Sequence, residues 1–458
     1  MNRDFFIEML QIDSTTGRER RLADFLAQRM AGPGRRVETF EVPSMAQDCP
    51  VGYDVPVNLM VSWGEPKVVF CTHLDTVPPY IAPSVETMEN GDVMIKGRGS
   101  CDAKGQIFSM WEACLELERW GCSDFALLLL AGEETGSYGA KSFNSMLFQA
   151  GAEGDWVITR ASSDAAVGPG ICSGKYGKDD RPPMPLRAGS EGDWVITRAS
   201  SDAAVGPGIC SGKYGKDGRP PMPLRAGAES DWVIIVGEPT DNTMASAAKG
   251  TKSFEVTFTG KACHSGYPQY GCSAVEMFSD FMNALRSIVF PKDYVLGDTT
   301  WNVGMLSSTN PQNILSDRLT CRVYFRTTFE SDEMVCNVMR NMSGPDAKLR
   351  FGRRKAQDGS DMVAKEVAQW QKSMSVKEFG GDSPTMYETL DGFDTKPVAF
   401  GSDAPQLKCF RRKILCGPGS ILVAHKDEEH IMLSELEAAT SGYVRMYDQL
   451  TAETKMIK

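Results

Sequence analysis

Histidine is scarce in this chain: the 458 residues include only His73, His264, His425 and His430. Any chemistry that needs an imidazole must therefore use one of these four positions. Long apolar runs are also missing, because the longest, Phe125–Ala131, is far shorter than the roughly 20 residues of a membrane-spanning helix. The first ten residues, MNRDFFIEML, include two acids, whereas the core of a secretory signal is uncharged. The sequence therefore predicts a cytoplasmic protein with no membrane segment.

An excess of positive charge is absent as well. The chain has 49 Lys and Arg residues against 60 Asp and Glu residues, which gives a formal net charge of −11. Such a chain is poorly suited to nucleic acid or to an anionic membrane surface, so neither is expected as its partner. The 13 cysteines are odd in number and include no C-x-x-C pair. Neither a disulfide framework nor a thiolate zinc site is predicted.

The length exceeds the limit of about 250–300 residues for a single core, so two domains are expected. Residues 67–75 (KVVFCTHLD) and 125–134 (FALLLLAGEE) are apolar runs that end in polar residues. Between them, residues 107–120 have the apolar period of a helix. This alternation predicts an α/β catalytic domain with a mostly parallel central sheet.

A second pattern begins after residue 250. Residues 253–260 (SFEVTFTG) and 319–329 (LTCRVYFRTTF) alternate in polarity, and an amphipathic helix is predicted over 274–288. These features predict a smaller α+β domain, inserted into the first, with an antiparallel sheet covered on one face by helices. The expected boundaries are 1–247 for the first part of the catalytic domain, 248–356 for the insertion and 357–458 for the second part.

The 38 residues 154–191 recur at 192–229 with only two differences. Both copies are rich in Gly, Pro and Ser and lack the diverged packing positions of a solenoid repeat. Removing 154–229 would leave an ordinary short connection between a helix and a strand. We therefore predict that this segment is a recent duplication or an artefact of the gene sequence and is disordered, rather than a folded insertion.

The sequence Asp-Trp-Val-Ile occurs three times, and only the third copy, which begins at Asp231, is followed by Gly-Glu-Pro-Thr. If an earlier copy took its strand position, Glu238 would lie far from the other polar residues and the chain would be inactive. We expect Trp232–Val236 to enter the sheet instead, next to the strand of residues 125–131, because its apolar run is longer.

Polar residues follow several of the apolar segments. Ligands of open α/β sheets bind at the carboxyl ends of the strands, so residues from distant parts of the chain can meet there. Imidazoles and carboxylates without thiolates suit zinc or a similar divalent ion. Two ions can be held if one carboxylate bridges them. The residues concerned are His73, Asp75, Asp102, Glu133, Glu134, Glu238 and His425.

The order of these blocks resembles the zinc-dependent aminoacylase and carboxypeptidase superfamily, which includes acetylornithine deacetylase, succinyl-diaminopimelate desuccinylase and glutamate carboxypeptidase. The matching motifs are H-x-D, G-R-G-x-x-D-x-K-G, E-E, an acid before P-T, and a late His in the segment VAHKDEEH, which stands where the family has an A-H-x-x-D-E context. The resemblance covers nearly the whole chain except 154–229. The blocks GSDAP and GPGS are closest to the acetylornithine deacetylase branch.

The resemblance implies a site for two zinc ions, with cobalt as a substitute. Asp102 would bridge the ions, with His73 and Glu238 on one of them. Glu134 and His425 would bind the other ion.

It also implies catalytic roles. Asp75 would orient His73, and Glu133 would be the general base that returns a proton to the leaving amine. His264 would stabilise the oxyanion from the inserted domain, often from the partner subunit of a dimer. A homodimer through that domain is therefore expected.

Substrate binding is implied for two residues of the inserted domain. Asn313 stands where the family has an N-x-x-P-D turn, although the proline is missing here, and Arg326 matches a strand arginine. The favoured activity is hydrolysis of the amide bond of an N-acyl amino acid by a hydroxide that bridges the metals. A dipeptidase or carboxypeptidase is the alternative, because it differs only in what fills the pocket.

Overall fold

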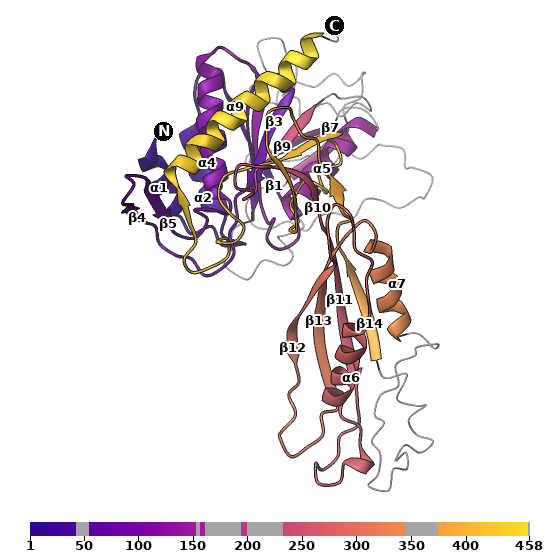
Figure 1. Cartoon of the computed structure of the whole chain (residues 1–458). Helices are drawn as coiled ribbons and strands as arrows, with labels where there is room; N and C mark the ends of the chain where they lie inside the picture. Colours follow the sequence, from indigo (N-terminus) through magenta and orange to yellow (C-terminus); the bar gives the residue numbers. More distant parts are fainter. Residues whose placement is uncertain (43–54, 153–155, 161–193, 199–231, 344–373, 457–458) are drawn as a thin grey trace, which may run out of the picture. The chain divides into compact units, whose positions relative to one another are not determined.

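The computed structural model describes residues 1–42, 55–152, 156–160, 194–198, 232–343 and 374–456 (Figure 1). The chain divides into two compact units, one of residues 1–141 with 231–458 and one of residues 142–230. Within the described ranges, no helix is long and apolar enough to span a membrane.

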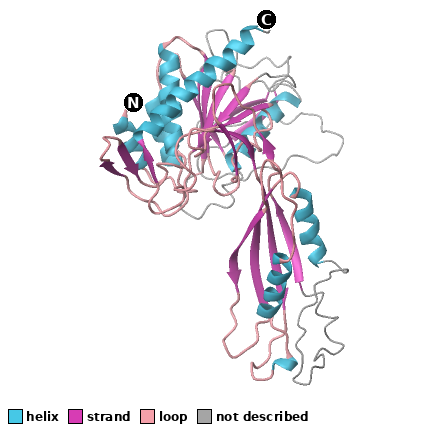
Figure 2. Cartoon of the chain, viewed as in Figure 1, coloured by secondary structure: helices cyan, strands magenta, loops and turns pink. Residues whose placement is uncertain are grey.

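A six-stranded sheet forms the centre of the α/β domain, in the order β1-β2-β6-β3-β9-β17. Figure 2 shows the strands in magenta and the helices in cyan. The last four strands of this order are parallel, whereas β1 and β2 are antiparallel to their neighbours. The predicted mostly parallel sheet is therefore confirmed. The strands are β1 (Arg36–Glu41), β2 (Val57–Gly64), β3 (Val68–His73), β6 (Asp124–Leu130), β9 (Val233–Val236) and β17 (Arg412–Leu415).

The apolar runs form the interior of this sheet. Every residue of β3 and β9 is buried, as expected for central strands covered on both faces. The helices α4 (Lys104–Arg119) and α9 (Leu433–Met456) pack on each other and on β3, while α1 (Arg3–Leu10) packs on α4 and α2 (Arg20–Met30) packs on β2. These helices therefore cover the apolar strands of the sheet.

One sequence expectation about this sheet is wrong. Val233–Val236 does enter the sheet, but it pairs with β3 and not with β6. The strand β3 lies between them, because it forms parallel ladders with both β6 and β9. All three strands are short and apolar, so local sequence does not encode their lateral order.

The inserted domain has a four-stranded antiparallel sheet in the order β12-β13-β11-β14. Burial alternates along β11, and α6 and α7 pack against one face of the sheet, as the alternating pattern predicts. The sheet includes β14, which lies beyond residue 356. The elements are β11 (Gly250–Thr259), η1 (Pro268–Tyr270), α6 (Ala274–Arg286), β12 (Thr300–Ser307), β13 (Arg318–Thr327), α7 (Asp332–Ser343) and β14 (Met374–Gly380).

Two small sheets complete the first unit, in the orders β15-β10-β16 and β18-β5-β4. Their strands are β4 (Ser84–Thr87), β5 (Val93–Lys96), β10 (Met244–Ala248), β15 (Thr385–Met386), β16 (Thr395–Val398) and β18 (His430–Met432).

The helix α5 (Tyr138–Ala152) precedes the duplicated segment. Within that segment the structure describes β7 (Trp156–Arg160) and β8 (Trp194–Arg198), which pair antiparallel with each other. Apart from these two strands, residues 154–229 lie outside the described residues, so the expectation that the segment is disordered or artefactual stays a prediction. The first two copies of Asp-Trp-Val-Ile thus contribute to β7 and β8, and the third copy forms β9.

Candidate metal centre

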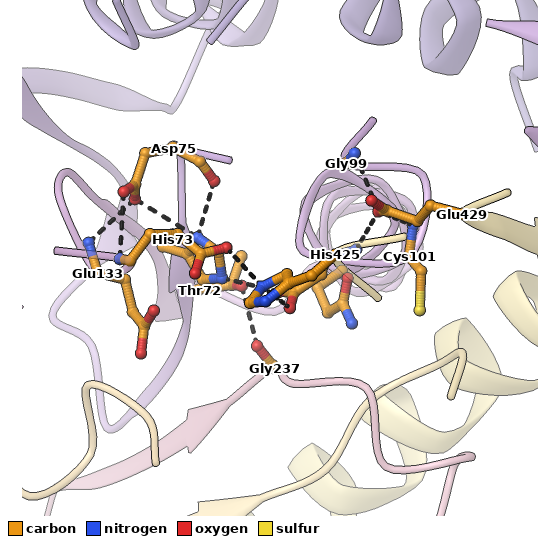
Figure 3. Close-up of polar contacts among 12 residues, drawn as sticks. Thr72, His73, Asp75, Gly99, Cys101, Glu133, Gly237, His425 and Glu429 are labelled. Atoms are coloured by element: carbon orange, nitrogen blue, oxygen red, sulfur yellow. Dashed lines mark hydrogen bonds and ion pairs between the residues drawn. The ribbon is translucent and has the colours of Figure 1, made fainter. Parts of the chain in front are cut away.

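Three neighbouring parallel strands bring polar residues to one edge of the sheet. His73 is the last residue of β3, and its register partner Leu130 is the last of β6. Glu133 and Glu134 follow shortly after β6, and Glu238 follows β9. The hydroxyl of Thr72 donates to the carbonyl oxygen of Gly237 at 2.9 Å, which ties the end of β3 to the segment that carries Glu238 (Figure 3).

Asp102 lies between two histidines. Its Oδ1 is 3.0 Å from Nε2 of His73, and its Oδ2 is 3.3 Å from Nε2 of His425. The same nitrogen of His425 is 3.0 Å from Oε1 of Glu134. The two oxygens of one buried carboxylate therefore face two separate imidazoles, the geometry that a bridging ligand requires.

The ligand atoms form three overlapping groups, each within 4.8 Å: His73 with Asp102 and Glu238, Asp102 with Glu134 and His425, and His73 with Glu133 and Glu134. The first two groups share Asp102 and contain the five residues that the resemblance implies as metal ligands. All the donors are imidazole nitrogens and carboxylate oxygens. This donor set fits zinc or another divalent ion of similar preference.

The electrostatics of the cluster also fit a cation. Burial raises the pKa values of Glu133, Glu134 and Glu238, and neighbouring acids raise them further. Hydrogen bonds with Asp102 and Glu134 raise the pKa of His425 to about 10. Charged carboxylates that are buried together are costly unless positive charge compensates them. Divalent ions would supply that charge and displace the protons from the ligands.

Asp75 supports both sides of the site. Nδ1 of His73 lies 2.9 Å from the backbone oxygen of Asp75 and 3.5 Å from its Oδ1, so this nitrogen carries the proton and Nε2 is left to act as a ligand. The carboxylate of Asp75 also accepts from the backbone N–H groups of Glu133 at 3.0 Å and of Glu134 at 3.2 Å. Asp75 therefore fixes the position of the His73 ring relative to the backbone of Glu133 and Glu134.

The two neighbouring acids point in different directions. Glu134 contacts His425, whereas Figure 3 shows the carboxylate of Glu133 pointing away from the His425 ring. One acid of the pair can therefore bind a metal while the other stays available for proton transfer. His425 itself is half-exposed, with a side-chain exposure of 47%, and it marks the side of the cluster that is open to solvent.

The inserted domain brings two of its three predicted site residues together. His264 forms an isolated bridge with Ile314, and the N–H of Ser265 donates to the oxygen of Asn313 at 2.9 Å. Nδ1 of His264 accepts from the N–H of Gly266 at 3.0 Å. The ring proton therefore sits on Nε2, which is free to donate. Among the described residues, no hydrogen bond or ion pair joins His264 or Asn313 to the metal cluster.

Arg326 occupies a different place, on β13. Its guanidinium carbon lies 5.0 Å from the centre of the Tyr324 ring, and its Nη1 is 3.6 Å from the position that a Cβ on Gly401 would take. The structure therefore brings Arg326 beside the GSDAP segment, and does not join it to His264.

Sequence reasoning missed several buried polar residues around this site. Asp403 of the GSDAP block is 2% exposed, and burial raises its pKa to about 7. Glu429 and Arg98 are each 1% exposed and form an ion pair behind Asp102. All three lie in motifs that are visible in the sequence, but nothing local separates a buried acid from its exposed neighbours.

Comparison with known proteins shows what this chain is similar to in sequence and in fold. Residues 246–344 match the peptidase dimerisation domain model of the M20 family. A protein named probable carboxypeptidase from Aspergillus terreus is 27% identical over 97% of this chain and 85% of its own length. Among solved structures, a tripeptidase from Staphylococcus aureus superposes with a TM-score of 0.61 at 16% identity, covering 98% of this chain and 97% of the other. An M20 metallo-carboxypeptidase from Sulfolobus solfataricus gives 0.55 at 12%, covering 97% and 98%.

The fold is therefore that of the M20 metallopeptidases, with an α/β domain that carries the candidate metal centre and a dimerisation domain. The family model matches residues 246–344, and nearly the whole chain is similar to a protein named as a carboxypeptidase and to solved peptidase structures. These three relatives are named as peptidases, so the expected acetylornithine deacetylase branch gains no support from them.

Proposed function

We propose that this protein is a two-metal peptidase of small peptides, in which Asp102 is shared by both ions. The position of Asp102 between His73 and His425, with one oxygen toward each, carries the proposal. His73 and Glu238 complete one ligand set. Glu134 and His425 complete the other, as the two donor groups that share Asp102 support.

Zinc is the proposed resident metal, with cobalt as a substitute. The donors are imidazoles and carboxylates, and each set offers three protein ligands. Three protein ligands leave a coordination position for water or substrate, as catalytic zinc sites require. When bound, the two ions supply an activated water and polarise the carbonyl of the scissile amide.

Glu133 is proposed as the group that moves the proton. It takes a proton from the attacking water and returns it to the nitrogen of the leaving amine. Burial raises the pKa of the Glu133 carboxyl, so it binds a proton more readily than a solvated acid does, which suits a group that accepts and returns a proton. Asp75 fixes the backbone of Glu133, so the base has a defined position.

The inserted domain is proposed to supply substrate contacts and the dimer interface. His264 would donate its Nε2 proton to the developing oxyanion. Asn313 and Arg326 would bind the substrate, the arginine through a carboxylate. We propose a homodimer, which the match of this region to a peptidase dimerisation domain supports.

We propose dipeptides and other short peptides as the substrate class. The names of the relatives support this choice, because they include a carboxypeptidase and a tripeptidase. An N-acyl amino acid remains the second candidate, since the same attack on an amide carbonyl would serve and only the pocket contacts differ.

The duplicated segment does not argue against activity. The third Asp-Trp-Val-Ile copy pairs with β3, and Glu238 lies in the cluster, which argues against the alternative of an inactive chain.

A cytoplasmic location is proposed from the composition.

Release of free amine from a panel of dipeptides, tripeptides and N-acetyl amino acids tests the proposal. We expect turnover of peptides that stops on chelation and returns when zinc is added. Turnover of N-acetyl amino acids alone would favour the second candidate. Turnover that is unaffected by chelation would refute the two-metal assignment.

A further inference from the structure

Glu429 sits directly behind the loop that carries Asp102. Its Oε1 accepts three backbone N–H groups, from Gly99 at 2.9 Å, Cys101 at 3.1 Å and Asp102 at 3.1 Å (Figure 3). Three donors from one short stretch of backbone form a concave anion site of the kind that holds a carboxylate firmly. One of the three donors belongs to Asp102 itself, so Glu429 acts on its backbone.

Arg98 occupies the other oxygen of Glu429. Its Nη1 lies 2.5 Å from Oε2 and also donates to the carbonyl oxygen of Lys426 at 3.2 Å. Its Nε donates to the carbonyl oxygen of Pro79 at 3.1 Å. Lys426 follows His425 directly, so the guanidinium binds the loop of the second histidine as well as the acid.

The pair therefore links two loops that are distant in sequence. One loop carries Asp102 and the other carries His425, whose side chains lie 3.3 Å apart in the metal cluster. The N–H of Gly97 also donates to the carbonyl oxygen of Glu429 at 3.0 Å, and β18 continues this contact by pairing with β5. The acid is thereby fixed by its backbone as well as by its side chain.

We propose that Glu429 and Arg98 are positioning residues, which hold Asp102 and His425 at the separation that a shared metal site needs. The inference rests on the proposed two-metal function. Neither residue touches the ligand atoms, so the pair acts through the backbone of the two loops. Partners that orient metal ligands typically change metal affinity about 10- to 100-fold when they are altered.

The chemistry of the site demands a carboxylate at position 429. A glutamine has one acceptor oxygen and one NH₂ group, so it must place donor against donor, either at Arg98 or at the backbone amides. At position 98, lysine keeps the positive charge but lacks the fork that reaches the Pro79 and Lys426 carbonyl oxygens together with the acid.

The test titrates metal-free wild type, Glu429→Gln and Arg98→Lys with zinc by calorimetry and with cobalt by absorbance, which reports ligand geometry. Glu428→Gln is the matched control, because Glu428 is the adjacent acid and is exposed. Far-UV circular dichroism measures the folded fraction of each protein. We expect zinc affinity about 10- to 100-fold weaker and an altered cobalt spectrum in both test variants, with wild-type behaviour in the control.

Three other outcomes would contradict either the positioning role or the proposed function. If the wild type binds two ions and the folded variants bind them equally well, the positioning role is wrong and the two-metal function stands. If affinity falls only in proportion to the folded fraction, the pair is merely structural and the inference is again wrong. A wild type that binds no metal would refute the proposed function, and the inference with it.

Discussion

The candidate site residues of the two domains have opposite surroundings. Around Asp102, in the α/β domain, the ligands are buried for the most part and contact one another. In the inserted domain, His264 and Asn313 are exposed, and their two loops pair with each other. A buried, mutually supported cluster can hold fixed geometry for metal ions, whereas exposed groups remain available for a substrate or a partner subunit. Metal binding should therefore depend on the first set alone.

The sharpest test within the first set uses two adjacent acids. Glu133→Gln should lower turnover by about 10³-fold, because general-base catalysis is lost, while metal content stays near that of the wild type. Glu134→Gln is the matched change one residue along, and it should lower metal content as well. Kinetics and elemental analysis on both variants check this. Equal metal loss in both would contradict the separation of base and ligand.

The corresponding test of the inserted domain is His264→Ala. Loss of a donor to the oxyanion should lower kcat by about 10²-fold, with metal content unchanged. His430→Ala serves as the control, because Nδ1 of that histidine lies 2.8 Å from the carbonyl oxygen of Glu428, outside the metal cluster. Metal loss in His264→Ala would contradict the statement that metal binding depends only on residues of the α/β domain.

A buried acid near the site, Glu19, predicts that the stability of the protein depends on pH. This side chain is fully buried, and burial together with the charge of Asp75 raises its pKa from 4.5 to about 8. The folded state therefore holds a proton that the unfolded state releases, so stability falls as pH rises from about 4.5 to about 8.

Replacing Glu19 with an uncharged glutamine should remove the loss of stability at high pH. The melting temperature of Glu19→Gln relative to wild type should therefore rise with pH, measured by thermal unfolding of metal-free protein at about pH 5 and about pH 9. Asp4→Asn is a control at an exposed acid. A constant difference between Glu19→Gln and wild type would mean that Glu19 does not titrate on folding.

Deletion of residues 154–229 should have the smallest effect. None of the ten candidate site residues lies in that segment, and the third Asp-Trp-Val-Ile copy already provides β9. We expect metal content and turnover close to those of the full chain. Activity that appears only after the deletion would show that the duplication disrupts the site.

The sequence predicted the members of the site better than their arrangement. The end of each apolar strand is visible locally, so His73, Glu134 and Glu238 could be placed at one sheet edge. The position of β3 between β6 and β9 could not be predicted, because the three strands have the same apolar character.

Burial of individual acids was equally hidden. Asp427, Glu428 and Glu429 are consecutive, and only Glu429 is buried, because the loop around Gly99 and Cys101 folds onto it from far away in the chain. The extent of the inserted domain was also not visible locally, since β14 joins its sheet from beyond residue 356.

The central claim is that two ions share Asp102. Elemental analysis of purified wild type, Asp102→Ala and the exposed control Asp427→Ala tests it most directly. We predict two metal equivalents per chain in the wild type and the control, and none in Asp102→Ala, because removing the bridge removes a ligand from both ions. A folded Asp102→Ala protein that keeps one or both ions would contradict the claim.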